Sequence, residues 1–304
     1  MSTPRSFWPR LSVIIPTRDR PVLVKRAVSC VLDQDYPGAI ECLVVFDQSP
    51  VNPVLVKHDN ARRELRFLRN SRTPGLSGTR NSGALAAKGE LVAFCDDDDE
   101  WLPSKARKQV KILTELGNVM VGCGISIQYG GRSIARLPPP VTSHRDLMRT
   151  FPMTLHSSTM MLRRTDMHRS LFDENMRHSE DYEWLIQIAS KMNIVALQEP
   201  LVRVHWDRRS WFVGKWGNIV EGMNYLVKKH PELQGNHRGL ARIYGQIAFA
   251  YAARGSKGEA KRWIFEALSL NWIEIRAYIS LLVLSNLVRP ETVLRWLNFF
   301  GRGL

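Results

Sequence analysis

The chain has 304 residues, of which 44% are hydrophobic and 24% are charged. This length and composition exclude a disulfide-stapled miniprotein, a fibrous protein and a largely disordered chain. Lys and Arg outnumber Asp and Glu by 43 to 29, which gives a formal net charge of +14. Such an excess predicts an anionic partner, which could be a phosphorylated substrate, nucleic acid or an acidic membrane surface.

The first expected elements alternate between strands and helices. Residues 11–15 (LSVII) form a short β-branched run that predicts a strand, and 22–32 carry apolar residues at helical spacing. The same criteria predict a strand at 41–46, a loop and then a helix ending at residue 63, a strand at 66–68, a helix at 79–87 and a strand at 91–95. This alternation predicts an α/β fold with a doubly wound, mostly parallel sheet.

The second half begins in the same way and then changes. We expect a helix at 103–116, a strand at 119–127, a surface hairpin or loop at 130–140, a strand at 158–162, a helix at 181–192 and a strand at 194–197. From 237 to 300 the apolar positions recur at three and four, with turns at Gly255 and near Pro290. The sequence therefore predicts an α/β domain over 1–210 and an all-helical C-terminal extension over 211–304.

The charge excess lies mainly in that extension. Up to Val202 the chain has 27 basic and 22 acidic residues, and after it 16 and 7. The four cysteines lie in or beside apolar runs without paired spacing, which favours reduced thiols. The start lacks an apolar signal segment, and the longest apolar stretch has twelve residues, fewer than the roughly 18 needed to span a bilayer. We expect a cytoplasmic protein without transmembrane helices.

Five consecutive carboxylates, DDDDE at 96–100, directly follow an apolar strand. They repel one another unless water, a cation or a hydrogen-bonding ligand offsets the repulsion. In an extended segment alternate residues point the same way, so Asp96 and Asp98 could face one site and hold Mg²⁺ or Mn²⁺ beside substrate phosphates. The alternative is a solvated acidic loop, or the first turn of the helix that starts near Pro103.

Several segments together resemble the inverting glycosyltransferases of family 2, which have a GT-A fold. They are LSVIIPTRDR, LVVFDQS, GLSGTRNSGALAAKGELVAFCDDDDEW, SEDYEW and VRVHWDRRS. They follow the family's order and cover about two thirds of the chain. The resemblance implies a Rossmann-like domain that binds a nucleotide diphosphate sugar at the carboxyl ends of its strands.

The resemblance assigns donor-side roles to residues at these strand ends. Those expected to contact the nucleotide or diphosphate are Pro16, Thr17, Asp19, Asp47, Arg80 and Asp96, with Asp97 as an alternative to its neighbours. The family usually has two acidic residues where this chain has Phe46 and Asp47. Thr17 and Asp19 would otherwise be read as a turn and a helix cap. Arg72 is a second candidate for the diphosphate, and Arg80 could be structural.

The metal and the acceptor are assigned in the same way. Asp98 looks like the metal ligand of the family's DxD motif, and His205 falls where the family often places a histidine toward the metal. The nearby Arg203, Arg208 and Arg209 could meet diphosphate oxygens or form a solvated basic face.

Asp181 of SEDYEW matches the family's general base, which deprotonates the acceptor hydroxyl. Glu180 would bind the acceptor or raise the pKa of Asp181 by like-charge repulsion, and Trp101 is assigned to the acceptor side. Alone, SEDYEW would be read as an acidic helix N-terminus capped by Ser179.

The leading hypothesis is a metal-dependent transferase that moves one sugar from a nucleotide diphosphate sugar, with UDP favoured by the resemblance, to an acceptor hydroxyl with inversion. The family's processive synthases carry a Gln-x-x-Arg-Trp motif, which is missing here. A sugar or lipid-linked acceptor in cell-surface polysaccharide synthesis is the expected context. The alternative is a non-catalytic protein that docks on an anionic membrane or nucleic acid through its basic helices. Nucleic acid is the poorer partner because the aspartates would repel it.

The stretch WIEIRAYISLLVLSNLVRPETVLRWLNFF combines tryptophans, apolar residues and arginines, as interfacial helices do. It is compatible with peripheral attachment to the inner face of a cell membrane. Ordinary packing against the catalytic domain or formation of a homodimer would explain the same residues.

Overall fold

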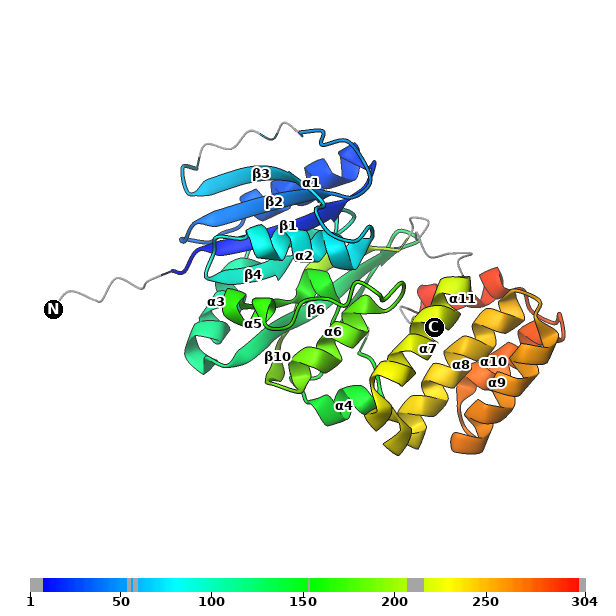
Figure 1. The fold of residues 1–304 in the computed structure, drawn as a ribbon. Coiled ribbons are helices and arrows are strands. Elements are labelled where there is room, and N and C mark those ends of the chain that lie inside the picture. The colour runs from blue at the N-terminus through cyan, green and yellow to red at the C-terminus, as the bar shows by residue number, and fades with distance from the viewer. Residues whose placement is uncertain (1–7, 54–55, 57–59, 153, 207–215, 301–304) are drawn as a thin grey trace.

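The computed structural model describes residues 8–53, 56, 60–152, 154–206 and 216–300. Its centre is a mixed sheet with the strand order β3-β2-β1-β4-β9-β6-β10-β5 (Figure 1). The first part of the sheet is parallel and consists of β1 (Leu11–Thr17), β2 (Ile40–Phe46), β3 (Arg63–Arg69) and β4 (Leu91–Phe94). The carboxyl ends of these strands therefore meet at one edge, as the doubly wound pattern predicts.

The second part of the sheet mixes both directions. The short strand β9 (Met161–Arg163) runs antiparallel between β4 and β6 (Val119–Tyr129), and β10 (Asn193–His205) is parallel to β6. Antiparallel additions are β5 (Glu100–Trp101) and β8 (Val141–Thr142) on β10, and β7 (Arg132–Arg136) on β6. The β6–β7 pair confirms the hairpin expected at 130–140.

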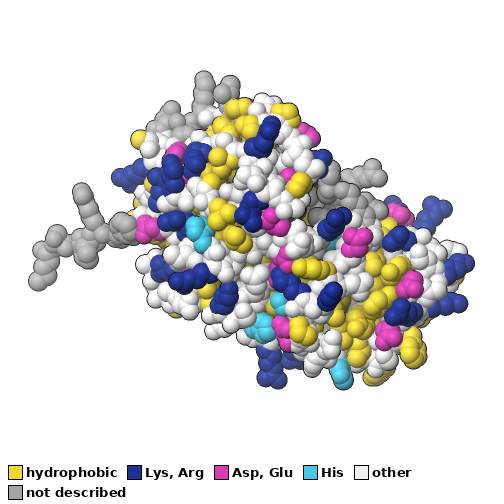
Figure 2. Space-filling view, in the orientation of Figure 1, with side chains coloured by type: hydrophobic (Ala, Val, Ile, Leu, Met, Phe, Trp, Pro, Cys, Tyr) yellow, Lys and Arg dark blue, Asp and Glu magenta, His cyan; other side chains and the backbone are white. Residues whose placement is uncertain are grey.

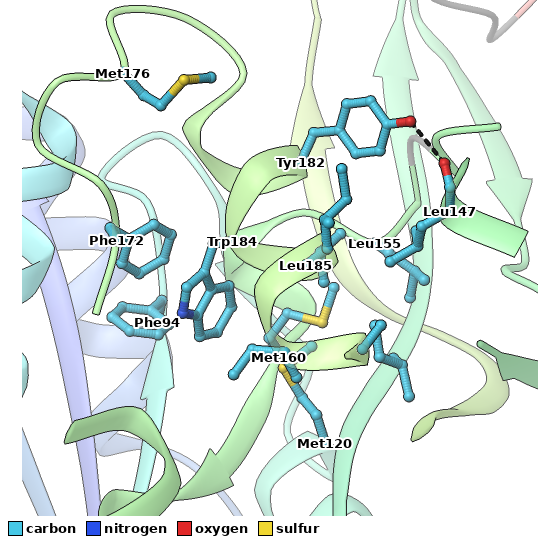
Figure 3. Close-up of a cluster of buried hydrophobic side chains, with 14 of the residues drawn as sticks. Phe94, Met120, Leu147, Leu155, Met160, Phe172, Met176, Tyr182, Trp184 and Leu185 are labelled. Carbon is cyan, nitrogen blue, oxygen red and sulfur yellow. Dashed lines mark hydrogen bonds between the residues drawn. The ribbon is translucent and has the colours of Figure 1, made fainter. Parts of the chain in front are cut away.

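Helices cover both faces of the sheet because its central strands are apolar on both sides. Helices α1 (Pro21–Leu32) and α3 (Lys105–Leu116) share a core with Val13 and Ile15, whereas α2 (Leu76–Ala86) and α6 (Glu180–Ala189) share the opposite core with Ile14. The second core includes Trp184, whose ring stacks on that of Phe172 at 4.4 Å (Figure 3). The indole N–H of Trp184 donates to the carbonyl of Ser170. This packing fixes α6 on the sheet.

Short helices connect these layers. They are α4 (His144–Arg149), the 3-10 helix η1 (Ser157–Thr159) and α5 (Arg164–His168). The hydroxyl of Tyr182 in α6 donates to the carbonyl of Leu147 in α4 at 2.7 Å, as Figure 3 shows. Helix α4 is thereby tied to the beginning of α6.

The C-terminal part is helical, as predicted. It contains α7 (Trp216–Lys229), the 3-10 helix η2 (Pro231–Gly235), α8 (His237–Ala253), α9 (Lys257–Leu270), α10 (Ile275–Leu284) and α11 (Pro290–Phe299). In Figure 1 these helices, yellow to red, form a block beside the sheet. Met223 and Ile243, from α7 and α8, belong to the same hydrophobic core as α6. The predicted boundary at residue 210 and residues 208 and 209 lie outside the described residues, so the division into two domains stays a prediction.

Three local predictions need correction. The helix expected to end at residue 63 is absent from the described part of 48–62, and the third strand starts at Arg63. The guanidinium of Arg63 donates to carbonyls of the α1–β2 connection, including that of Leu32 at 2.9 Å. The strand expected at 158–162 begins only at Met161, after η1. Strand β10 extends to His205 instead of ending at residue 197. Among the described helices, none is both long and apolar enough to cross a bilayer.

Candidate active site

The acidic run forms a turn directly after β4. The backbone N–H of Asp99 donates to the carbonyl of Asp96 at 3.0 Å, which closes a tight turn over Asp97 and Asp98. Residues three apart in such a turn come to the same side, in contrast to the alternation of an extended segment. Asp96 and Asp99 therefore approach one another. In the extended segment expected from the sequence, Asp96 and Asp98 would face the same site.

The middle of the turn is held by the last residue of β1, Thr17, and by Arg20 just after the strand. The hydroxyl of Thr17 donates to Asp97 at 2.8 Å, and Nη1 of Arg20 donates to Asp97 at 3.0 Å and to Asp98 at 3.1 Å. Burial raises the pKa of Asp97 to about 6, with a further contribution from the charge of Asp98, against the opposing effect of Thr17 and Arg20. Asp97 thus joins the β1 and β4 ends of the sheet.

Arg80, from α2, connects two groups of carboxylates. Its side chain is 2% exposed and donates to Asp96 and to Glu180, each at 2.9 Å. It also donates to the hydroxyl of Ser157, which in turn donates to Asp96 at 3.1 Å. Arg80 therefore joins the acidic turn to the start of α6, so that the predicted donor-side and acceptor-side carboxylates lie close together.

Asp96 and Asp99 form a possible metal-binding group with His156, which precedes η1. One ligand atom from each of the three residues lies within 4.8 Å of the others. Burial, together with the charges of Asp98 and Asp96, raises the pKa of Asp99 well above its usual range. Burial also lowers the pKa of His156 to about 4, so its imidazole is neutral at pH 7, and its Nε2 is buried without a hydrogen-bond partner.

These donors fit a divalent cation. A cation would offset the repulsion between the two carboxylates and would use the lone pair of a neutral imidazole. The observation behind this fit is Nε2 of His156, which is buried without a hydrogen-bond partner. A bound cation would compensate for the hydrogen bonds to water that this nitrogen loses on burial.

A cavity of about 250 Å³ opens beside this group. Its lining includes Asp96, Asp98, Asp99, Ile125, Phe151, His156, Asp181, Val204 and Trp206. Asp181 lies in the first turn of α6 and accepts the backbone N–H of Tyr182 at 2.9 Å. Burial, and secondly the charge of Glu180, raises the pKa of Asp181 to about 7, which is suitable for a base at neutral pH.

Comparisons with known proteins show the family of this chain. The sequence model of Glycosyl transferase family 2 matches residues 12–172, which is more than half of the chain. The chain belongs to glycosyltransferase family 2. The protein is therefore a glycosyltransferase with a GT-A-type fold, and the non-catalytic alternative is dropped.

One relative is WfgD of Escherichia coli, a UDP-Glc:alpha-D-GlcNAc-diphosphoundecaprenol beta-1,3-glucosyltransferase. It is 26% identical over 195 residues, which cover 62% of this chain and 72% of WfgD. The fold is similar to that of S. aureus TarS 1-349 in complex with UDP-GlcNAc, with a TM-score of 0.62 and 14% identity over 96% of this chain and 92% of that one. Against a longer TarS structure the match covers 91% of this chain and 55% of that one.

A third similar protein is the mannosyltransferase PcManGT from Pyrobaculum calidifontis, whose structure contains GDP-Man and Mn²⁺. The TM-score is 0.56 and the identity 17%, over 95% of this chain and 83% of PcManGT. Identities this low establish the fold and leave the donor of this glycosyltransferase open.

The other predicted donor-side residues of the glycosyltransferase lie around the ends of β1 and β2. Pro16 is buried in β1, and Asp19 is exposed in a left-handed conformation with a φ of 52°. Asp47 accepts hydrogen bonds from Asn70 at 2.9 Å and from the backbone N–H of Gly75 at 3.2 Å, directly before α2. Its carboxylate thus stabilises the loop before α2, and its expected contact with the nucleotide stays a prediction.

Two predicted residues have other partners. His205 is not part of the metal-binding group among the described residues, because its Nε2 lies 2.7 Å from Glu100, which also binds Arg203 at 3.2 Å. Trp101 is 2% exposed, and its indole N–H donates to the carbonyl of Ser158 at 3.0 Å. In this arrangement His205 does not reach the metal group and Trp101 offers no surface to an acceptor.

Sequence reasoning missed the segment around η1. His156 contributes a nitrogen to the possible metal-binding group. Ser157 donates to the side chain of Asp96, and Ser158 accepts the backbone N–H of Asp96. The segment has no regular apolar period, and a lone histidine is usually structural. The only local signal was the run of polar residues HSST before a strand.

Proposed function

We propose that this glycosyltransferase is metal-dependent and inverting, and that it moves one sugar from a nucleotide diphosphate sugar to the hydroxyl of a lipid-linked or sugar acceptor in polysaccharide synthesis. The observation that carries the proposal is the common cavity of Asp181 with Asp96, Asp99 and His156. A single site would then combine a carboxylate with a pKa of about 7 and three side chains that would hold a divalent cation.

The donor is expected to bind at the carboxyl ends of β1, β2 and β4. Pro16, Thr17, Asp19 and Asp47 lie there, and Thr17 is already bonded to the acidic turn. UDP is the favoured nucleotide because WfgD uses UDP-Glc by its name and the TarS structure contains UDP-GlcNAc. The lipid-linked acceptor is favoured by the diphosphoundecaprenol in the name of WfgD.

Asp96, Asp99 and His156 are the residues that would hold the metal, with Asp98 beside them in the cavity as a further candidate. The metal would neutralise charge on the leaving diphosphate. The resemblance assigned Arg80 to the diphosphate, but we propose a different role for it. Its guanidinium forms ion pairs with Asp96 and Glu180, so it would fix the positions of these two carboxylates relative to one another.

Asp181 would act as general base. A bond forms between the acceptor oxygen and the anomeric carbon while the bond from that carbon to the diphosphate oxygen breaks, and Asp181 takes the proton of the acceptor hydroxyl. Attack from the face opposite the diphosphate inverts the anomeric centre. Glu180 bonds to Arg80, and its charge supports the raised pKa of Asp181. Phe151 and Trp206 provide apolar surface in the same cavity for a sugar ring.

The proposal is tested by thermal-shift measurements with UDP, GDP and TDP and their sugars, with Mn²⁺ or with EDTA. A ligand that binds only the native state raises the Tm, so at least one nucleotide should raise it with Mn²⁺ and less with EDTA. Asp99→Asn should reduce this rise, whereas Asp33→Asn, at an exposed position after α1, should not. No rise with any nucleotide would contradict the proposal.

A further inference from the structure

Helix α10 exposes an apolar face. Ile275, Tyr278, Leu281 and Leu282 recur at helical spacing and are 41% to 62% exposed. Trp272 and Ile273, in the turn before the helix, are 76% and 61% exposed. We call these six residues the α10 face. Surface helices normally carry polar residues on the outward side, so this face reverses the usual pattern.

The α10 face is presented by a folded scaffold. The opposite side of the helix buries Ala277 and Val283 against α8 and its neighbours. The helix start is fixed by Glu274, which accepts the backbone N–H of Arg276 at 3.3 Å. The hydroxyl of Tyr278 donates to the carbonyl of Trp272 at 2.6 Å, which joins the turn to the helix. The exposed side chains therefore belong to an ordered surface, and contiguous apolar surfaces of this kind mark interaction sites.

Basic residues and further aromatics surround this helix in sequence. Between residues 237 and 300 the chain has nine Lys and Arg and four Glu. Exposed examples on α9 and α11 are Lys261, Arg262 and Arg295. Val293 of α11 and Val283 of α10 belong to the same small hydrophobic cluster, together with Phe249 of α8. Figure 2 shows hydrophobic side chains over the C-terminal helices, with basic and acidic side chains around them.

We propose that the α10 face docks the protein on an anionic lipid bilayer. Trp and Tyr prefer the headgroup level, aliphatic side chains enter the acyl boundary, and nearby Lys and Arg bind anionic headgroups. A second copy of the chain fits less well, because a symmetric contact would bring together two C-terminal parts that each have nine Lys and Arg against four Glu between residues 237 and 300. The proposal rests on the proposed function only in the choice of a lipid-linked acceptor.

Helix α11 connects this surface to the candidate active site. The guanidinium of Arg132 lies 4.6 Å from the ring centroid of Phe299, and Arg136 donates to the carbonyl of Phe300. Both arginines belong to β7, where Arg136 pairs with Ile125 of β6, a residue that lines the cavity. The exposed aromatic end of α11 is thus one strand away from the cavity lining. Docking through the C-terminal helices would keep the cavity close to the bilayer that contains a lipid-linked acceptor.

The test is co-sedimentation of the full chain with vesicles of phosphatidylglycerol and phosphatidylcholine, and with vesicles of phosphatidylcholine alone. We expect binding to the anionic vesicles and at least about tenfold weaker binding of the double variant Leu281→Glu/Leu282→Glu, because two half-exposed leucines lose their burial in lipid. The control Leu85→Glu/Leu116→Glu adds the same charge at positions on α2 and α3 that are 45% and 53% exposed. It should bind within about twofold of the wild type.

Two outcomes would overturn the proposal: failure of the wild-type chain to bind anionic vesicles, or equal binding of the wild type and the α10 variant. A dimer in sedimentation velocity that the α10 variant converts to monomers would assign the face to a second copy instead. The Mn²⁺-dependent thermal shift with nucleotides, measured on the same variants, reports separately on the proposed catalytic site. A docked protein without that shift would preserve this inference and contradict the proposed function.

Discussion

Replacement of Arg80 by Met tests how the two carboxylate groups are held together. The guanidinium is 2% exposed and bonds to Asp96 and Glu180, whose side chains are 27% and 10% exposed. In Arg80→Met both carboxylates lose their cationic partner while they remain largely out of water. Breaking a buried ion pair in this way costs about 3–5 kcal/mol, most of it from the charge that is left without a partner.

We therefore expect Arg80→Met to lower the free energy of unfolding by about 3 kcal/mol at pH 7.5, the lower end of that range, because the partial exposure of Asp96 reduces the loss. Arg80→Lys retains the charge but cannot bond to both carboxylates with a rigid fork, so it should recover only part of this loss. The assay is urea denaturation followed by circular dichroism.

The matched control is Arg169→Met. This side chain is 76% exposed and lies 3.8 Å from Asp166, so its replacement should change the free energy of unfolding by less than about 0.5 kcal/mol. A loss below about 1 kcal/mol for Arg80→Met, or a loss equal to that of the control, would refute the reasoning that Arg80 compensates both carboxylates.

Three other predictions concern the site and its support. His156→Ala should weaken Mn²⁺ binding, measured by calorimetry in the presence of UDP, by at least about tenfold, and unchanged affinity would remove His156 from the ligand set. The transfer rate should rise with pH through about 7, because a base with a raised pKa is ionised only above that pKa; a rate that is constant between pH 6 and 8 would contradict the role of Asp181. Lys229→Met should cost about 1–3 kcal/mol in urea denaturation, because Glu183 on α6 is fully buried and loses a partner at 2.8 Å, whereas Lys228→Met, at an exposed position, should cost less than about 0.5 kcal/mol.

The sequence was sufficient where the signal is local. The apolar runs that form β1, β2 and β4 alternate with amphipathic helices, and this alternation alone predicted the parallel part of the sheet. The same pattern directed attention to the strand ends at Thr17 and Asp96, which the structure connects through Asp97. The helical C-terminal part was also predicted, since the period of three and four continues over more than sixty residues.

The sequence was insufficient where a turn or a distant contact decides the geometry. The turn between Asp96 and Asp99 depends on one backbone hydrogen bond, and in a run of four aspartates no residue marks where the chain bends. His156 comes to this turn from a position sixty residues later in the chain, through the bonds of Ser157 and Ser158 to Asp96. The helix predicted to end at Arg63 fails for a similar reason, because that side chain binds carbonyls of a connection about thirty residues earlier.

The surface of the C-terminal helices could likewise be predicted only in part from the sequence. The apolar and basic character of the C-terminal helices was visible in the sequence, but helical spacing cannot tell a buried stripe from an exposed one. The structure buries Ala277 and Val283 and leaves Tyr278 and Leu282 exposed. Only this assignment of faces supports the proposed docking on lipid.

The central claim is that Asp181 is the general base at a nucleotide-sugar site. Its most direct test compares Asp181→Asn with the wild type and with Asp33→Asn, measuring both the Tm shift and the rate of sugar transfer with the donor that stabilises the protein most in the presence of Mn²⁺. We predict that Asp181→Asn retains the Tm shift and loses transfer by about 100-fold or more, while Asp33→Asn retains both. Transfer by Asp181→Asn within about tenfold of the wild-type rate would contradict the account.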